Sequence, residues 1–250
     1  MSEEPQKPGM LIKILVGGLP LGLFIGVVVA ALLYVKNHNE ALPELNASGK
    51  GYTRDMTAES IADRFQKFEE GSDGRVVGSS EGVAQLRAAE ALLRTSMNMS
   101  NMGFRNINTL EAENDGTVLR AMWVDVLGVR NPSEVIEVRV PYDQREGDDG
   151  SGSLALAVAL ELANSLTGTE NRRTIRFAFV PDGAVGGAVS AAYQAIYDDR
   201  QVRLLAGFEL FESGDFDPAR FRAEGGEIQW QGVLDFALKT RKEIVSVANQ

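Results

Sequence analysis

The sequence of 250 residues contains no cysteine and a single histidine, His38. Without cysteine the chain can form no disulfide and has no thiolate to act as a nucleophile or a metal ligand. The histidine stands just after an apolar run near the N-terminus, so a zinc site that uses histidine cannot be built in the rest of the chain. Metal sites made of carboxylates alone favour hard ions such as calcium or magnesium.

Basic residues are also scarce relative to acidic ones. The chain has 25 lysines and arginines against 35 aspartates and glutamates, which gives a formal net charge of −10. This acidic balance, together with the lack of a clustered basic run, argues against a nucleic acid partner. The length is sufficient for one sizeable domain.

Charged residues are absent from Ile14 to Val35. As a helix this run is roughly 33 Å long, which matches the apolar core of a bilayer. We therefore predict a transmembrane helix over 14–35, after a short polar tail at 1–13 and before a linker at 36–54. The alternative is a cleaved signal peptide, whose apolar core is normally shorter.

Small residues recur every fourth position within this run, at Gly18, Gly22 and Gly26. Such a face can pack against another transmembrane helix. The alternative is that glycine is simply common in membrane helices, and Pro20 interrupts the same stretch. Lysines flank the run on both sides, so the charge pattern alone does not set the membrane orientation.

The remaining residues, 55–250, alternate between helical and strand patterns. Thr57 is suited to cap a helix that carries Ile61, Phe65 and Phe68 on one face. Strands that alternate with helices predict an α/β fold around a mixed, largely parallel sheet. Further helices are predicted at 83–97, 151–166, 184–197 and 231–247, and strands at 104–110, 117–127, 134–140, 174–180 and 202–211.

Three stretches of the sequence carry recognisable motifs: Val140-Pro-Tyr-Asp143, Glu146-Gly-Asp-Asp-Gly-Ser-Gly152 and Phe177-Ala-Phe-Val-Pro-Asp-Gly-Ala-Val-Gly-Gly187. They resemble the site motifs of the zinc aminopeptidases, the group that includes bacterial leucyl aminopeptidases, glutaminyl cyclase, transferrin receptor and nicastrin. In that family a strand ends in His-Tyr-Asp, a Gly-Ala-Asp-Asp-Asn-x-Ser-Gly turn opens a helix, and a later strand ends in Asp-Gly-Glu-Glu-x-Gly. The loop 73–82 is similar to the family's Arg-x-x-Gly-Ser segment.

The resemblance implies a three-layer α/β sandwich and a reaction in which zinc activates water while a glutamate takes its proton. The chain departs from the family at the ligands: Pro141 stands where the first histidine belongs, and Gly183 and Ala184 stand where the two glutamates belong. None of these side chains can ligate zinc. We therefore predict no bound zinc, no cofactor and no catalytic residue.

Acidic side chains remain at or near the family's ligand positions. One interpretation is a residual site for a cation or a polar ligand. The alternative is local structure, because Asp149 and Ser151 stand at a helix start and Asp182-Gly183 is a common turn pair. Capping alone accounts for these residues, so we assign them no metal. The acidic positions are Asp143, Asp148, Asp149, Asp182 and Glu209.

The resemblance covers about 57–214, and the last part, 215–250, diverges. We expect a membrane-anchored, non-catalytic aminopeptidase-like domain that binds a protein partner or acts as a scaffold, and the resemblance places it outside the cytoplasm. One alternative is a hydrolase with a rearranged site of carboxylates only. Another is a structural subunit of a membrane complex that assembles through Gly18, Gly22 and Gly26.

Overall fold

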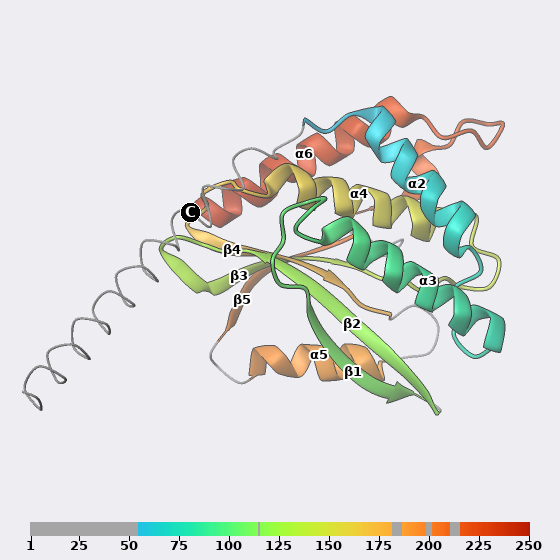
Figure 1. Cartoon of the computed structure of the whole chain (residues 1–250). Coiled ribbons are helices and arrows are strands. Elements are labelled where there is room, and N and C mark those ends of the chain that lie inside the picture. The colour runs from blue at the N-terminus through green and yellow to red at the C-terminus, as the bar shows by residue number, and fades with distance from the viewer. Residues whose placement is uncertain (1–54, 115, 182–186, 199–201, 211–215) are drawn as a thin grey trace, which may run out of the picture. The chain divides into compact units, whose positions relative to one another are not determined.

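The structure is a computed structural model that describes residues 55–114, 116–181, 187–198, 202–210 and 216–250 (Figure 1). The chain divides into two compact units, Met1–Ser48 and Gly49–Gln250, and all of the described residues belong to the second. Within the described ranges no helix is both long and apolar enough to cross a membrane. The predicted transmembrane helix at 14–35 with Gly18, Gly22 and Gly26, the tail at 1–13 and the linker at 36–54 lie outside these ranges.

The centre of the domain is a mixed sheet of five strands in the order β1-β2-β4-β3-β5. The pairings of β1 with β2 and of β2 with β4 are antiparallel, whereas β3 is parallel to both β4 and β5. The prediction of a mixed sheet is thus confirmed, although parallel pairings make up half of it rather than most. The strands are β1 (Asn108–Asn114), β2 (Thr117–Val126), β3 (Asn131–Val140), β4 (Arg173–Phe179) and β5 (Arg203–Glu209).

Helices lie on both sides of the sheet, so the domain has three layers (Figure 1). Four helices form the layer on one face, and a shorter helix packs against β1 and β2 on the other. The first layer consists of α2 (Ala58–Ser72), α3 (Ser80–Met97), α4 (Ser151–Leu166) and α6 (Trp230–Asn249); the other helix is α5 (Ala188–Asp198), and a short 3-10 helix, η2 (Pro218–Phe221), precedes α6.

Helix α4 is the core of the helical layer. Every residue from Ser151 to Leu166 except Gly152 is buried, as expected for a helix that is apolar on all sides. It contacts β3 beneath it and α2, α3 and α6 around it. Its one acidic residue, Glu161, is buried and paired with Arg64 of α2, which avoids the large cost of an unpaired buried charge.

The opposite face of the sheet is polar and is bound to α5 by charged and aromatic side chains. Arg176 on β4 donates to both carboxylate oxygens of Asp125 on β2, at 2.8 and 3.0 Å. Glu137 on β3 accepts from the hydroxyls of Tyr193, at 2.6 Å, and of Tyr197. A buried carboxylate needs hydrogen-bond donors, and both of these hydroxyls come from α5, so this helix is positioned by directional bonds as well as by apolar packing.

The predicted elements agree with the structure in their type and order. Thr57 caps α2 as expected, accepting from the backbone of Ser60 at 3.0 Å. The strand predicted at 104–110 instead begins at Asn108. After α3 ends at Met97, the amides of Asn101, Met102 and Gly103 donate to the carbonyl of Asn98 and form a turn, and Phe104 is buried in the segment that follows.

Candidate functional site

The site lies at the carboxyl ends of β3 and β4, because parallel strands place these ends at the same edge of the sheet. The two ends are joined by a hydrogen bond of 3.1 Å from the Val180 amide to the Val140 carbonyl. The loop 141–150 leaves β3 here and leads into α4, and Pro181 follows β4. The motif stretches that are distant in the sequence therefore meet at one place, which is where ligands dock in open α/β sheets.

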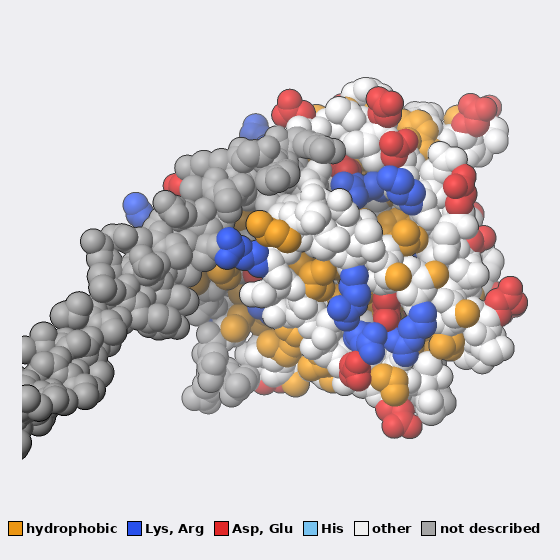
Figure 2. Space-filling view, viewed as in Figure 1, with side chains coloured by type: hydrophobic (Ala, Val, Ile, Leu, Met, Phe, Trp, Pro, Cys, Tyr) orange, Lys and Arg blue, Asp and Glu red, His pale blue; other side chains and the backbone are white. Residues whose placement is uncertain are grey.

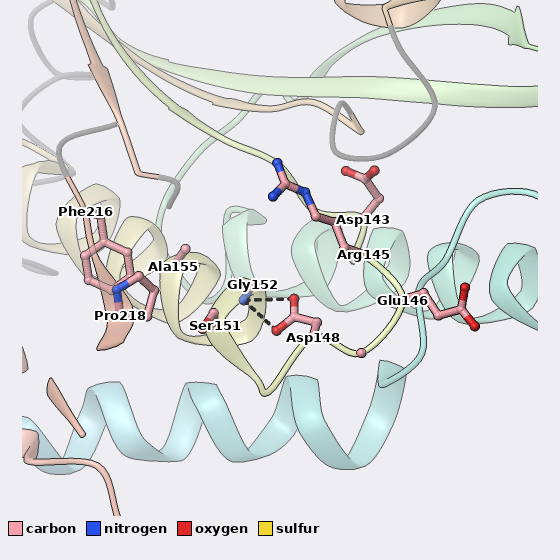
Figure 3. A pocket seen from close by; sticks show the side chains of 10 residues that line it. Asp143, Arg145, Glu146, Asp148, Ser151, Gly152, Ala155, Phe216 and Pro218 are labelled. Atoms are coloured by element: carbon pink, nitrogen blue, oxygen red, sulfur yellow. Dashed lines mark hydrogen bonds between the residues drawn. The ribbon is translucent and has the colours of Figure 1, made fainter. Parts of the chain in front are cut away.

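A cavity of about 160 Å³ opens beside this loop (Figure 3). Figure 3 shows Asp143 and Arg145 turned to the same side, while Glu146 points away from them. The cavity has an acidic and an apolar part, since carboxylates line one side and apolar groups the other. Its lining consists of Asp143, Arg145, Glu146, Gly147, Asp148, Ser151, Gly152, Ala155, Phe216 and Pro218.

A completely buried arginine, Arg75, supports the loop from below. Its Nε donates to the carbonyl of Tyr142 at 2.8 Å, and Nη1 donates to the carbonyl of Ser72 at 2.8 Å. Its Nη2 donates to the hydroxyl of Ser153 at 3.1 Å. One side chain thus joins the end of α2, the loop after β3 and the first turn of α4.

The backbone of Arg75 makes two further bonds to the same loop. Its amide donates to Gln144 Oε1 at 3.0 Å, and its carbonyl accepts from the Gln144 amide at 3.0 Å. Burial lowers the pKa of Arg75 to about 10, an effect that the negative charge of Asp148 partly offsets. The guanidinium therefore remains charged at neutral pH and forms a rigid floor for the site.

The two neighbouring aspartates have separate local partners. Asp148 faces the first turn of α4 and accepts from the Gly152 amide at 3.2 Å (Figure 3). Asp149 accepts from the hydroxyl of Ser151 and forms an ion pair of 3.1 Å with Arg222. The hydrogen bond from Ser151, ahead of the charge of Arg222, lowers the pKa of Asp149. Local bonding thus engages both residues, and the cap of α4 comes from Asp148 rather than from Asp149.

The other predicted site residues fall in different places. Pro141 is buried directly after β3. Asp143 is buried and lies between the main cavity and a smaller one lined by Val77 and Leu119. Glu209, at the exposed end of β5, is not part of the main cavity lining. Asp182, Gly183 and Ala184 lie outside the described residues.

The described side chains do not fit a zinc ion. Across the described ranges, no three histidine, cysteine, aspartate or glutamate side chains form a group that could hold a metal. Proline at position 141 offers no donor at the end of β3, and the carboxylate of Asp148 faces a helix amide. Because 182–186 is not described, the absence of bound zinc stays a prediction.

The C-terminal part of the chain contributes a wall of the cavity that the sequence did not indicate. Phe216 and Pro218 line the cavity, and Phe216 packs against Phe221 and Phe236, with ring centroids 5.6 and 5.2 Å apart. Arg222 also donates to the carbonyl of Asp149. No spacing in the sequence pairs these residues with the loop 141–150; the only available signal was their aromatic composition.

Comparison with known proteins gives a likeness of fold. No protein-family model matches the chain, and no curated protein matches it. Similar solved structures include LapB from Legionella pneumophila (18% identity, TM-score 0.49, 66% of this chain and 45% of that chain) and the LapA aminopeptidase of the same organism (16%, 0.46, 67% and 45%). Another is the glutaminyl cyclase of an Acidobacteriales bacterium (16%, 0.48, 62% and 58%). The chain matches about half the length of these proteins.

Proposed function

We propose that this domain is a non-catalytic, aminopeptidase-like binding domain that is anchored to a membrane through 14–35 and holds a basic group of a protein partner in the cavity beside loop 141–150. The observation that carries this proposal is the combination of groups around the cavity. Three carboxylates and one guanidinium, that of Arg145, stand on one side, so this side is acidic on balance, and an apolar wall stands on the other. The carboxylates are Asp143, Glu146 and Asp148, and the wall is Ala155, Phe216 and Pro218.

This combination suits a lysine or arginine side chain. Such a side chain has an apolar stem, which packs against an apolar wall, and a charged head, which pairs with carboxylates. The cavity of about 160 Å³ is small beside the roughly 300–1,000 Å³ of typical ligand pockets. A single side chain of a partner therefore fits it better than a small-molecule substrate does.

The bonding of the polar groups supports a binding role rather than catalysis. A nucleophile needs a nearby base that is free to take its proton. The Ser151 hydroxyl donates to Asp149, and that carboxylate is also paired with Arg222. Asp148 caps α4 and lies close to the charge of Arg75. The carboxylate beside Ser151 is thus already paired and is not free to act as its base.

Binding of trilysine amide to the full chain in detergent tests the proposal. We expect measurable affinity that weakens as salt rises, because the attraction is electrostatic. Glu146→Gln should weaken it about two- to fivefold, the usual effect of removing one exposed charge. Glu224→Gln is the matched control, since Glu224 is an exposed carboxylate that is not part of the cavity lining. Equal affinity for triglutamate amide, or equal effects of both variants, contradicts the proposal.

The membrane anchor and the side of the membrane are separate parts of the proposal. The chain should remain in the membrane fraction after a carbonate wash, because 14–35 contains no charged residue. Protease added to intact cells should digest the domain if it lies outside the cytoplasm. Release of a mature protein that begins beyond Val35 contradicts the membrane anchor. Full protection of the domain from the protease contradicts its location outside the cytoplasm.

A further inference from the structure

The amino ends of the parallel strands form a surface whose charge differs from that of the whole chain. We call it the amino-end surface and define it as the loops 127–134 and 167–173 together with Val202 and Arg203. These segments contain four arginines and two glutamates, although the chain as a whole carries −10. The arginines are Arg130, Arg172, Arg173 and Arg203, and the glutamates are Glu134 and Glu170.

Two apolar side chains project from the same surface. Leu127 is 56% exposed and Val129 is 55% exposed, the highest fractions for large apolar side chains in the described part of the domain. They flank Gly128 and precede Arg130, so apolar and basic groups are adjacent. Exposed apolar residues beside basic residues are characteristic of a surface that contacts a membrane or a partner.

The loop that carries these residues is held rigidly. The Val129 amide donates to the Asn171 carbonyl at 2.8 Å, and the Asn131 amide donates to the Arg172 carbonyl at 2.8 Å. Gly128 lies so close to the next loop that a Cβ there would be 2.4 Å from the carbonyl carbon of Arg173. The exposure of Leu127 and Val129 is therefore a fixed feature of the backbone.

The arginines of this surface fall into two groups. Arg173 bonds Glu134 at 2.8 Å and a carbonyl of α6, and Arg172 bonds the Gln250 carbonyl at 2.9 Å. Arg130 and Arg203 are exposed and make no ion pair within 4 Å among the described residues. The first group fixes the surface, and the second presents positive charge to the solvent.

We infer that the amino-end surface docks on the anionic headgroups of a lipid bilayer. The occupant is indicated by charge complementarity: guanidinium groups bind phosphate with paired hydrogen bonds, and neighbouring leucine and valine side chains enter the boundary between headgroups and acyl chains. The cavity lies at the other ends of the same strands, so docking turns it toward the solvent, where a protein partner can reach it. The inference does not depend on what the cavity binds.

A fluorophore on the full chain, reconstituted in phosphatidylcholine vesicles with or without phosphatidylglycerol, tests this inference. Because the chain lacks cysteine, Ser133→Cys places a single label on the amino-end surface. Ser80→Cys places a single label at the start of α3, near the opposite ends of the strands. With phosphatidylglycerol present, headgroup spin labels should quench the label at 133 several times more than the label at 80.

Charge and apolar variants separate the two contributions. Arg130→Gln with Arg203→Gln should reduce the docked population about fivefold for each arginine, and Leu127→Ser with Val129→Ser should reduce it as well. Lys67→Gln with Arg220→Gln, which removes two exposed positive charges from α2 and η2, should leave quenching unchanged. Equal quenching of both labels overturns the inference. Quenching of the label at 133 that does not need the anionic lipid, or that is caused by added protein instead of lipid, overturns it as well.

Discussion

Arg75 Nε donates a hydrogen bond of 2.8 Å to the backbone carbonyl of Tyr142, 67 positions further along the chain. This bond connects the loop that follows α2 to the first residues after β3. The Tyr142 hydroxyl in turn shares its single proton between two acceptors, the Arg120 carbonyl at 2.6 Å and Glu90 Oε1 at 3.1 Å. The shape of the cavity therefore rests on buried polar bonds beneath the loop, whereas Glu146 on the loop is exposed to the solvent.

Arg75→Lys should lower the free energy of unfolding by about 3 kcal/mol. A lysine cannot reproduce the three separate donors of the guanidinium, and buried carbonyls would lose their partners. Urea denaturation followed by circular dichroism measures the change. The matched control is Arg105→Lys, at an exposed arginine, which should change stability by less than about 0.5 kcal/mol. A loss no larger than that of the control would show that Arg75 is dispensable.

Gly128→Ala should destabilise the domain by about 2 kcal/mol or more, because the added Cβ collides with the backbone of Arg173 at 2.4 Å. Gly225→Ala is a suitable comparison, since a Cβ there meets nothing within 4 Å. The midpoints of thermal unfolding of the two variants give the answer. If both variants melt together, the loop 127–134 is more adaptable than the close approach implies.

Asp125→Asn should cost about 3 kcal/mol of stability, because it leaves the guanidinium of Arg176 buried without its counter-charge. Their side chains are only 17% and 7% exposed. Burial lowers the pKa of Arg176, but the hydrogen bond with Asp125, its negative charge and the two nearby tyrosines together outweigh this and raise the pKa. The exposed pair of Lys239 and Glu243 serves as a control, and Glu243→Gln should have almost no effect. Similar losses in both would contradict the role given to the buried pair.

Two buried tyrosines, Tyr142 and Tyr193, and the partly buried Tyr197 should make the domain sensitive to alkali. Burial, followed by the charge of Glu137, raises the pKa of Tyr193 and Tyr197 above the ordinary value, and burial followed by the charge of Glu90 raises that of Tyr142. The folded state keeps these protons at a pH where the unfolded state loses them. Stability is therefore full below about pH 10 and falls above it.

Tyr193→Phe isolates one of these groups. Above about pH 10 the free energy of unfolding should fall by about 1.4 kcal/mol per pH unit for each buried tyrosine, so the variant should show a slope that is smaller by this amount. Urea denaturation from neutral to alkaline pH measures both slopes. Parallel slopes for the variant and the unaltered chain would show that Tyr193 ionises equally in both states.

The elements that the sequence predicted well are those whose signals are local. The continuous apolar run of α4 can be satisfied only by burial on all sides, and the β-branched run of β3 is typical of a strand covered on both faces. The cap at Thr57 involves residues three positions apart. The meeting of loop 141–150 with the end of β4 followed from the resemblance, which orders the strands.

The features that the sequence did not predict depend on contacts between distant segments. Arg75 belonged to a recognised motif, but its burial beneath Tyr142 follows from the packing of α2 against α4. Phe216 and Arg222 come from the divergent part of the chain, where no motif indicated a place in the site. The charged network under α5 was not predicted either, because its partners lie on different strands and on the helix.

We propose above that this domain binds a protein partner and does not use a metal to hydrolyse a substrate. The most direct measurement is the zinc content of the purified full chain after incubation with zinc and gel filtration. We expect a zinc content far below one ion per chain, because the described part of the domain offers no group of three suitable ligands and the chain has no cysteine and one histidine. One or two tightly held zinc ions per chain would contradict it.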